Sequence, residues 1–114
     1  MDRQPDMTTR QQAWEELVEA VLICVEQVPR GRVTTYGAIA DAVGSASPRR
    51  VGNVMSRHGS AVPWWRVVRA DGTLPVCHDG GARAHHLDEG TPLRPSGRVD
   101  LPAAFFQPSL DAAP

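Results

Sequence analysis

Apolar residues recur at every third or fourth position near the beginning of the chain. This spacing predicts an amphipathic helix over residues 9–28. Thr9 and Gln12 fit a capping box at its first turn, while Pro29 and a following glycine would end it. We expect residues 1–8 to be a flexible N-terminus. The apolar stripe consists of Trp14, Leu17, Val18, Val21, Val25 and Val28.

Two shorter apolar patterns follow, separated by only about three residues. Thr35 is a plausible N-cap for the first helix, and Gly44 is a natural stop for it. Ser47 is the predicted N-cap of the second helix, with Pro48 at its first helical position. A pair of short helices with a basic second member is typical of a helix-turn-helix. Its outer face keeps Arg49, Arg50, Asn53 and Arg57.

The rest of the chain, from residue 64 on, has weaker patterns. The segment "WWRVVRADGTL" (residues 64–74) has a β-branched centre and an Asp-Gly turn, which predict a small β hairpin, or wing. "GGARAHHLDEG" predicts one more short helix, and the chain after it is irregular. We expect a mainly α, winged helix-turn-helix-like single domain over residues 9–106, followed by a disordered tail over residues 107–114.

Charge is distributed unevenly along the 114 residues. The segment 30–69 contains seven arginines and one acid, whereas the rest holds five arginines and twelve acids, so charges of +6 and −7 sum to the net −1. A basic middle in a nearly neutral protein favours a one-sided surface for anions. No stretch approaches the ~20 apolar residues of a membrane helix, and the polar beginning lacks a secretory signal. We therefore expect a cytoplasmic protein that binds no membrane.

Cysteine and histidine suggest only minor alternatives. Cys24 lies on the apolar stripe, where a free buried thiol is the simplest interpretation. Cys77 and His78, together with His85 and His86, could suggest a metal site, but their spacing matches no common zinc pattern. We expect neither a metal nor a cofactor.

Four short motifs occur in the order found in a known family: Thr35-Tyr36-Gly37, Arg49-Arg50-Val51-Gly52, Pro63-Trp64-Trp65-Arg66-Val67 and Glu89-Gly90. Together they resemble the DNA-binding domain of the O6-alkylguanine-DNA alkyltransferases over about residues 14–90. The family's reactive cysteine falls on Trp64, and its neighbouring histidine falls on Trp65. An indole cannot act as the nucleophile that a thiolate provides.

The chain thus resembles the alkyltransferase-like branch of the family, in which tryptophan replaces the cysteine. The resemblance implies a non-enzymatic protein that flips O6-alkylguanine out of double-stranded DNA into a pocket. It also implies that the lesion is handed to nucleotide excision repair proteins. We expect a monomer in this role.

The resemblance also implies roles for individual residues. Arg49 would fill the hole left by the flipped nucleotide, Tyr36 would press on the backbone, and Gly52 would let the helix approach the minor groove. Arg50 would contact phosphate. The implied DNA-binding set is Thr35, Tyr36, Arg49, Arg50, Gly52 and Asn53. The implied alkylguanine pocket is Pro63, Trp64, Trp65, Arg66, Val67 and Arg69.

Three points stay open at this level. His58 falls near a family asparagine, and Cys77 falls near an arginine that grips the base, for which Arg69 or Arg83 could substitute. Trp65 could face either the pocket or the core. Two other functions are considered: a winged-helix regulator that reads a specific sequence with residues 48–59, and an alkyltransferase whose nucleophile has moved to Cys77.

Overall fold

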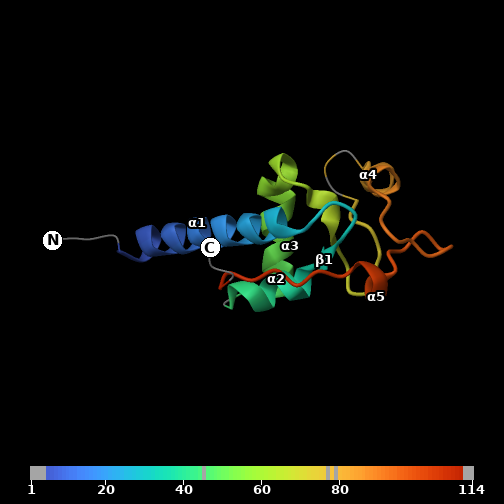
Figure 1. Ribbon diagram of the computed structural model, residues 1–114. Coiled ribbons are helices and arrows are strands. Elements are labelled where there is room, and N and C mark those ends of the chain that lie inside the picture. The colour runs from blue at the N-terminus through green and yellow to red at the C-terminus, as the bar shows by residue number, and fades with distance from the viewer. Residues whose placement is uncertain (1–4, 45, 77, 79, 112–114) are drawn as a thin grey trace.

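The computed structural model describes residues 5–44, 46–76, 78 and 80–111. Helices dominate it, and a small two-stranded sheet lies beside them (Figure 1). None of the described helices combines the length and hydropathy that are needed to cross a membrane. The elements in chain order are α1 (Pro5–Gln27), β1 (Thr34–Thr35), α2 (Tyr36–Val43), α3 (Pro48–His58), the 3-10 helices η1 (Gly59–Ala61) and η2 (Trp64–Arg66), β2 (Val67–Val68), α4 (Ala82–Glu89) and α5 (Leu101–Ala104).

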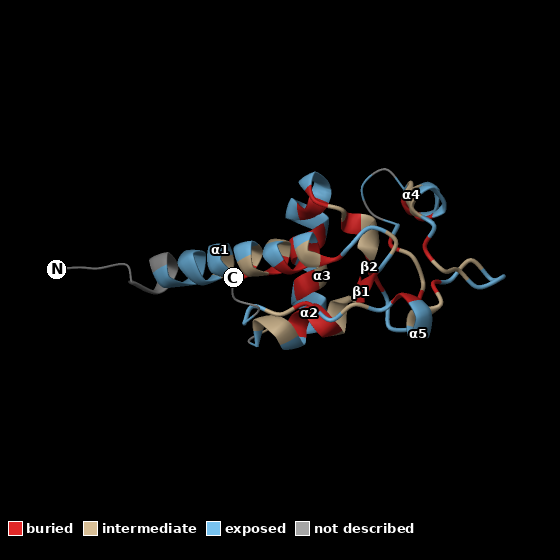
Figure 2. Cartoon of the chain, in the orientation of Figure 1, coloured by how far each residue is buried: buried red, intermediate tan, exposed pale blue. Residues whose placement is uncertain are grey.

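Helix α1 begins earlier than its apolar pattern predicts. Its first residue is Pro5, so Thr9 lies inside the helix and cannot serve as its N-cap. Residues 5–8 are therefore helical in their backbone, and the flexibility expected of them stays a prediction. Proline favours the first helical position because its φ is already helical and its missing N–H is not needed there. The outer part of α1 extends away from the body, and among the residues of α1 whose burial is described, the buried ones lie in its inner part (Figure 2).

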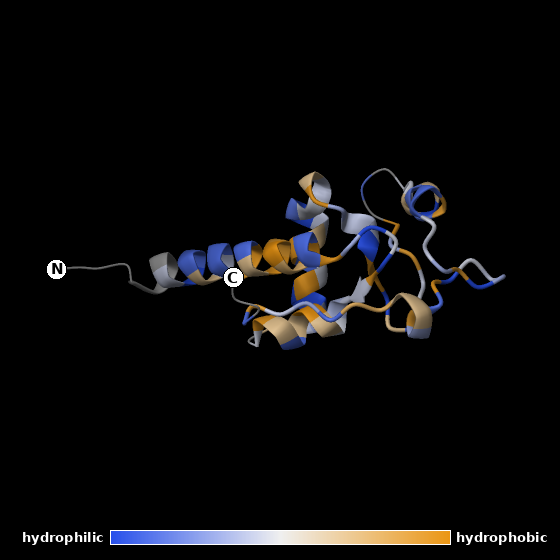
Figure 3. Cartoon of the chain, in the orientation of Figure 1, coloured by the Kyte–Doolittle hydropathy of each residue, from blue (hydrophilic) through white to orange (hydrophobic). Residues whose placement is uncertain are grey.

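The predicted helix pair is confirmed, including its caps. The Oγ1 of Thr35 accepts a hydrogen bond of 3.0 Å from the Ala38 backbone N–H, and Gly44 ends α2 with a φ of 79°. The Oγ of Ser47 accepts from the Arg50 N–H at 3.3 Å, with Pro48 at the first position of α3. Apolar residues line the junction of α1, α2 and α3 (Figure 3). This core includes Leu17, Val21, Val25, Ile39, Val51, Val54 and Met55.

The sheet differs from the predicted hairpin. β2 pairs in parallel with β1, so that Thr34 lies opposite Val67 and Thr35 opposite Val68. The turn at Asp71-Gly72 does form, since the Gly72 N–H donates to the Arg69 carbonyl at 2.8 Å, but the described residues after it form no second strand of a hairpin. Both valines of β2 are fully buried. Burial against a distant segment outweighs the local turn signal, because strand pairing is decided largely by packing.

The C-terminal segment is more ordered than its composition suggests. The short helix α4 is confirmed, whereas α5 lies in the stretch expected to be irregular. The Gln27 side chain donates to the Ser109 carbonyl at 2.8 Å and accepts from its N–H at 2.9 Å. Gln107 donates to the Ala38 carbonyl at 3.1 Å. The expectation of a disordered tail is therefore wrong for residues 107–111, which these hydrogen bonds fix to α1 and α2, and residues 112–114 lie outside the described residues.

Candidate nucleic-acid interface

A shallow hollow lies along the outer side of α3. It has a volume of about 400 Å³ and is lined by Tyr36, Pro48, Arg49, Gly52 and Arg69. Arg49 and Arg69 are exposed, and Tyr36 is half-buried. The hollow therefore combines two guanidinium groups with an aromatic side chain and a glycine, a set suited to a polyanion that approaches closely.

A second cavity, with a largely apolar lining, adjoins this hollow. Its volume is about 340 Å³, and it shares Tyr36, Gly52 and Arg69 with the hollow. Such a volume lies within the range of pockets that hold small planar ligands. The remaining described lining is Met55, Ser56, Thr73, Leu74, Pro75 and Val76.

Gly52 lies where the hollow and the cavity meet. A Cβ atom built at this position would have no other atom within 4 Å, so the glycine is not required by packing inside the protein. A helix-interior glycine costs about 1 kcal/mol relative to alanine. Its absence of a side chain leaves the backbone of α3 open to an external molecule.

Arg69, rather than Arg83, lies at the cavity. Arg69 lines both the hollow and the cavity, whereas the guanidinium of Arg83 lies beside Gly97. Asn53 is exposed on α3, and Thr35 serves as the cap of α2. His58 does not reach the cavity lining either, since its ring packs 6.0 Å from that of Trp14.

Trp64 lies in the core of the protein. Only 5% of its surface is exposed, and the described lining of the cavity does not include it. Its ring packs edge-on against Trp65 at 5.6 Å and His85 at 5.8 Å, and lies 5.1 Å from the ring of His78. The structure thus buries the indole of Trp64 among the rings of the half-buried Trp65 and His85 and the exposed His78, outside the described cavity lining.

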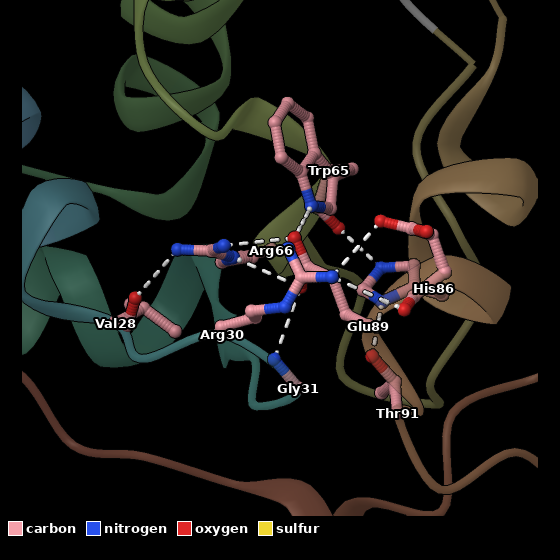
Figure 4. A network of polar contacts seen from close by, with 9 residues as sticks. Val28, Arg30, Gly31, Trp65, Arg66, His86, Glu89 and Thr91 are labelled. Carbon is pink, nitrogen blue, oxygen red and sulfur yellow. Dashed lines mark hydrogen bonds and ion pairs between the residues drawn. The ribbon is translucent and has the colours of Figure 1, made fainter.

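Trp65 is not among the described residues that line the cavity, and it joins a polar network around Glu89 (Figure 4). Its indole N–H donates to the Glu89 carboxylate at 2.8 Å, and its ring stacks on His85 at 3.7 Å. Arg66 donates two hydrogen bonds to the same carboxylate, of 3.1 and 2.8 Å, and a third of 3.0 Å to the Val28 carbonyl. The Gly31 N–H also donates to Glu89, at 3.0 Å. Trp65 and Arg66 therefore fix η2 to α1 and α4.

Burial and hydrogen bonding act in opposite directions on Glu89. Only 2% of its side chain is exposed. Burial alone raises its pKa, but hydrogen bonds from Arg66, Gly31 and Trp65 outweigh this effect and lower the pKa to about 2. Glu89 is therefore an anion at neutral pH and serves as the counter-ion of Arg66.

His86 is a second buried titratable group beside this network. Its Nε2 lies 2.7 Å from the Trp65 carbonyl, and its Nδ1 lies 2.8 Å from the Thr91 hydroxyl. A carbonyl can only accept, so Nε2 carries the proton and Nδ1 accepts from Thr91. Burial lowers the pKa of His86, which keeps the ring neutral.

His86 and Glu89 should make the protein less stable as the pH falls, in two separate steps. Unfolded His86 gains a proton as the pH falls through its ordinary pKa of 6.5, whereas the folded protein resists it. Unfolded Glu89 gains a proton near pH 4.5 and the folded protein only near 2, a step worth at most about 3 kcal/mol. Urea unfolding between pH 3 and pH 8 should show both steps. Glu89→Gln should remove the lower step, and an unchanged profile in that variant would contradict the assignment.

Sequence reasoning brought together residues that the structure separates. Tyr36, Arg49 and Gly52 of the implied DNA-binding set meet Arg69 of the implied pocket set at the hollow. Their roles toward DNA stay predictions. Pro63 and Val67 belong instead to the frame, since Pro63 precedes η2 and Val67 is fully buried in β2. The roles of Glu89, His86 and Thr91 as a buried network were missed, although Glu89 stood in a recognised motif. These residues meet η2 only because α4 lies next to it in the folded protein, which the sequence does not indicate.

The described residues do not support the two alternative sites, a metal site and a nucleophile at Cys77. Cys77 lies outside them. Cys24 is a free, buried cysteine whose pKa is raised by burial. Within the described part of the chain, no three histidine, cysteine or acidic side chains gather as a metal ion would require. His85 and His86 have separate partners, Trp65 and Thr91.

The fold and the site together define a helix-turn-helix domain with a basic hollow and an adjoining apolar cavity beside its second helix. Residues 16–89 match the family model of the 6-O-methylguanine DNA methyltransferase, DNA binding domain. The chain therefore belongs to this family.

Named relatives and solved structures support the same relationship. The chain is 40% identical over 82 residues to the DNA base-flipping protein of Escherichia coli K12, which covers 68% of this chain and 64% of that protein. It is 41% identical over 63 residues to Alkyltransferase-like protein 1 of Schizosaccharomyces pombe, covering 53% and 58% of the two chains. The chain thus spans less than two thirds of the length of either relative.

The structure resembles S. pombe Atl1 in its complex with damaged DNA containing O6-carboxymethylguanine. The TM-score is 0.69 at 29% identity, and the match covers 82% of this chain and 97% of Atl1. A second structure, of S. pombe ATL in complex with DNA, gives the same TM-score at 31% identity. The mainly helical fold predicted from the sequence is therefore confirmed.

Proposed function

We propose that this protein binds damaged DNA without repairing it, by flipping O6-alkylguanine into the cavity beside α3. The observation that carries the proposal is the direct junction between the basic hollow and the apolar cavity, which share Tyr36, Gly52 and Arg69. The hollow suits a phosphate backbone and the cavity suits an alkylated base. Relatives are named for base flipping and for binding DNA with an O6-alkylated guanine.

The absence of alkyl transfer is part of the proposal. Alkyl transfer in this family needs a thiolate, and Trp64 stands at the position of the reactive cysteine. Its indole has no lone pair available for such a displacement, and Trp65 is engaged with Glu89. The protein would act as a monomer that marks the lesion for nucleotide excision repair proteins.

Binding should distinguish damaged from undamaged duplexes. The basic hollow contributes to both, whereas the cavity contributes only when a base is flipped into it. Base stacking and burial are worth about 1–3 kcal/mol, so a duplex with one O6-methylguanine should bind roughly five- to 150-fold more tightly. Titrations of both duplexes at one salt concentration would measure the ratio.

Two results would contradict the proposal. Equal affinity for both duplexes would exclude lesion recognition, and a preference for one undamaged sequence would favour a winged-helix regulator instead. A gain of one methyl group in the mass of the protein after incubation with the lesion would show alkyl transfer, including transfer to Cys77.

Gly52→Ala should separate DNA approach from folding. The added methyl group would project into open space, so we expect a fold up to about 1 kcal/mol more stable. The same methyl group would meet the DNA backbone and lower the affinity for both duplexes about tenfold, or 1.4 kcal/mol. Thermal unfolding and binding titrations test the two effects separately. A variant that is more stable and binds DNA normally would place the duplex elsewhere.

A further inference from the structure

The side of α3 that faces α1 has a second basic surface, separate from the hollow. The guanidinium carbons of Arg50 and Arg57 lie 5.7 and 5.9 Å from the ring centre of Trp14. The ring of His58 lies 6.0 Å from the same indole. Two arginines of one helix thus share one tryptophan of another, in a cluster that we call the Trp14 surface (Trp14, Arg50, Arg57 and His58).

Both arginines of this surface keep their charge available. They are exposed, and neither forms an ion pair with a carboxylate among the described residues. A guanidinium held over an indole loses little further side-chain freedom when it binds an anion. Cation–π contact leaves its N–H donors directed outward, where a phosphate can accept them.

The geometry of α3 places the two basic surfaces on opposite flanks of one exposed arc. Each residue turns an α-helix by about 100°, so Arg50 and Arg57, seven positions apart, project to nearly the same side. Arg49 and Gly52 face the hollow instead, and the exposed Asn53 lies between the two flanks. A helix in a groove of duplex DNA is bordered by one sugar-phosphate backbone on each side.

We propose that the Trp14 surface binds phosphates of the DNA strand opposite the flipped nucleotide, with Trp14 as the residue that positions Arg50 and Arg57. This inference rests on the proposed function, in which the hollow on the other flank of α3 holds the damaged strand. The ligand class is the phosphodiester backbone. The contact carries no information about the lesion, so it strengthens damaged and undamaged complexes alike.

Arg57→Ala is the direct test, with Arg30→Ala as the matched loss of charge. Arg30 pairs with the exposed Asp88 at 3.0 Å and belongs to neither flank of α3. We expect Arg57→Ala to weaken the binding of both duplexes about five- to tenfold. We also expect it to reduce the salt slope, the dependence of log affinity on log salt concentration, by about one. Arg30→Ala should leave the slope unchanged, and the preference for O6-methylguanine should be the same in both variants.

Trp14 is tested by two substitutions that keep the apolar packing. Trp14→Leu removes the aromatic face and should reproduce the weaker binding and smaller slope of Arg57→Ala, although both arginines remain. Trp14→Phe keeps an aromatic face and should restore most of the affinity. Thermal unfolding of each variant confirms that the folded protein is compared. Equal affinity of Trp14→Leu and the unmodified protein would exclude the positioning role.

Neutral methylphosphonate linkages identify the strand that is contacted. Placed in the strand opposite the lesion, they should abolish the difference between the unmodified protein and Arg57→Ala, whereas the same change in the damaged strand should leave it. The inference would be overturned if only the modified damaged strand abolished the difference. It would also be overturned if Arg57→Ala had the same salt slope as Arg30→Ala. If the unmodified protein showed no preference for the O6-methylguanine duplex, the proposed function would be overturned instead. The salt slopes of the variants would still report on the Trp14 surface.

Discussion

Replacing Glu89 with alanine is expected to lower the free energy of unfolding by about 3–5 kcal/mol. The carboxylate accepts hydrogen bonds from Arg66, Trp65 and Gly31, and its removal would leave these donors without an acceptor. Only 14% of the Arg66 side chain is exposed, so its charge would stay largely buried without a counter-ion. Urea denaturation at pH 7 would measure the loss.

Asp88→Ala is the matched control because it removes the neighbouring carboxylate. Asp88 pairs with Arg30, but their side chains are 76% and 62% exposed. Exposed ion pairs contribute at most about 1 kcal/mol. Similar losses in the two variants would show that the Glu89 network does not stabilise the fold more than an ordinary surface pair does.

Local signals in the sequence were sufficient for the helix pair. Thr35, Ser47 and Pro48 define helix starts through contacts within three residues, and Gly44 ends α2 by its left-handed backbone. None of these effects depends on distant parts of the chain. The exposed position of Arg49 on α3 could be anticipated for the same reason, whereas Arg69, which completes the hollow, lies outside this helix.

Features that depend on distant contacts could not be predicted in this way. The Asp-Gly turn suggests a hairpin, but the buried strand β2 pairs with residues 34–35. The tail looks irregular, yet the Gln27 amide supplies both a donor and an acceptor for Ser109. In both cases the partner is more than 30 residues away, where neither periodicity nor turn chemistry gives information.

The pocket motif mixes residues with different roles. Arg66 and Trp65 bind Glu89, and Val67 lies in the sheet, so most of "PWWRV" builds the frame of the fold and not the described lining of the cavity. The described lining of the cavity consists instead of residues 73–76 after the turn, of Tyr36 and Arg69, and of three residues of α3, namely Gly52, Met55 and Ser56. Adjacent residues of a short 3-10 helix project in different directions, so proximity in sequence does not make a common site.

Trp64→Ala should therefore act first on folding. Trp64 is 5% exposed and packs against the rings of Trp65, His78 and His85. Truncation of a buried tryptophan costs about 3–5 kcal/mol, since it leaves a void that the surroundings fill only in part. Thermal and urea unfolding would measure the loss. A cost below about 1 kcal/mol would show that the indole does not fill the core in solution.

Trp64→Phe distinguishes a supporting role from contact with the flipped base. Phenylalanine keeps an aromatic ring in the core, so this variant should lose less stability than Trp64→Ala and remain folded at 25 °C. If Trp64 supports the cavity wall from behind, the ratio of affinities for O6-methylguanine and undamaged duplexes should change by less than about threefold. Loss of the preference in the folded variant would instead show that the indole reaches the base. Arg49→Ala provides the comparison, because its side chain lines the hollow and lesion binding should fall while stability changes by less than about 0.5 kcal/mol.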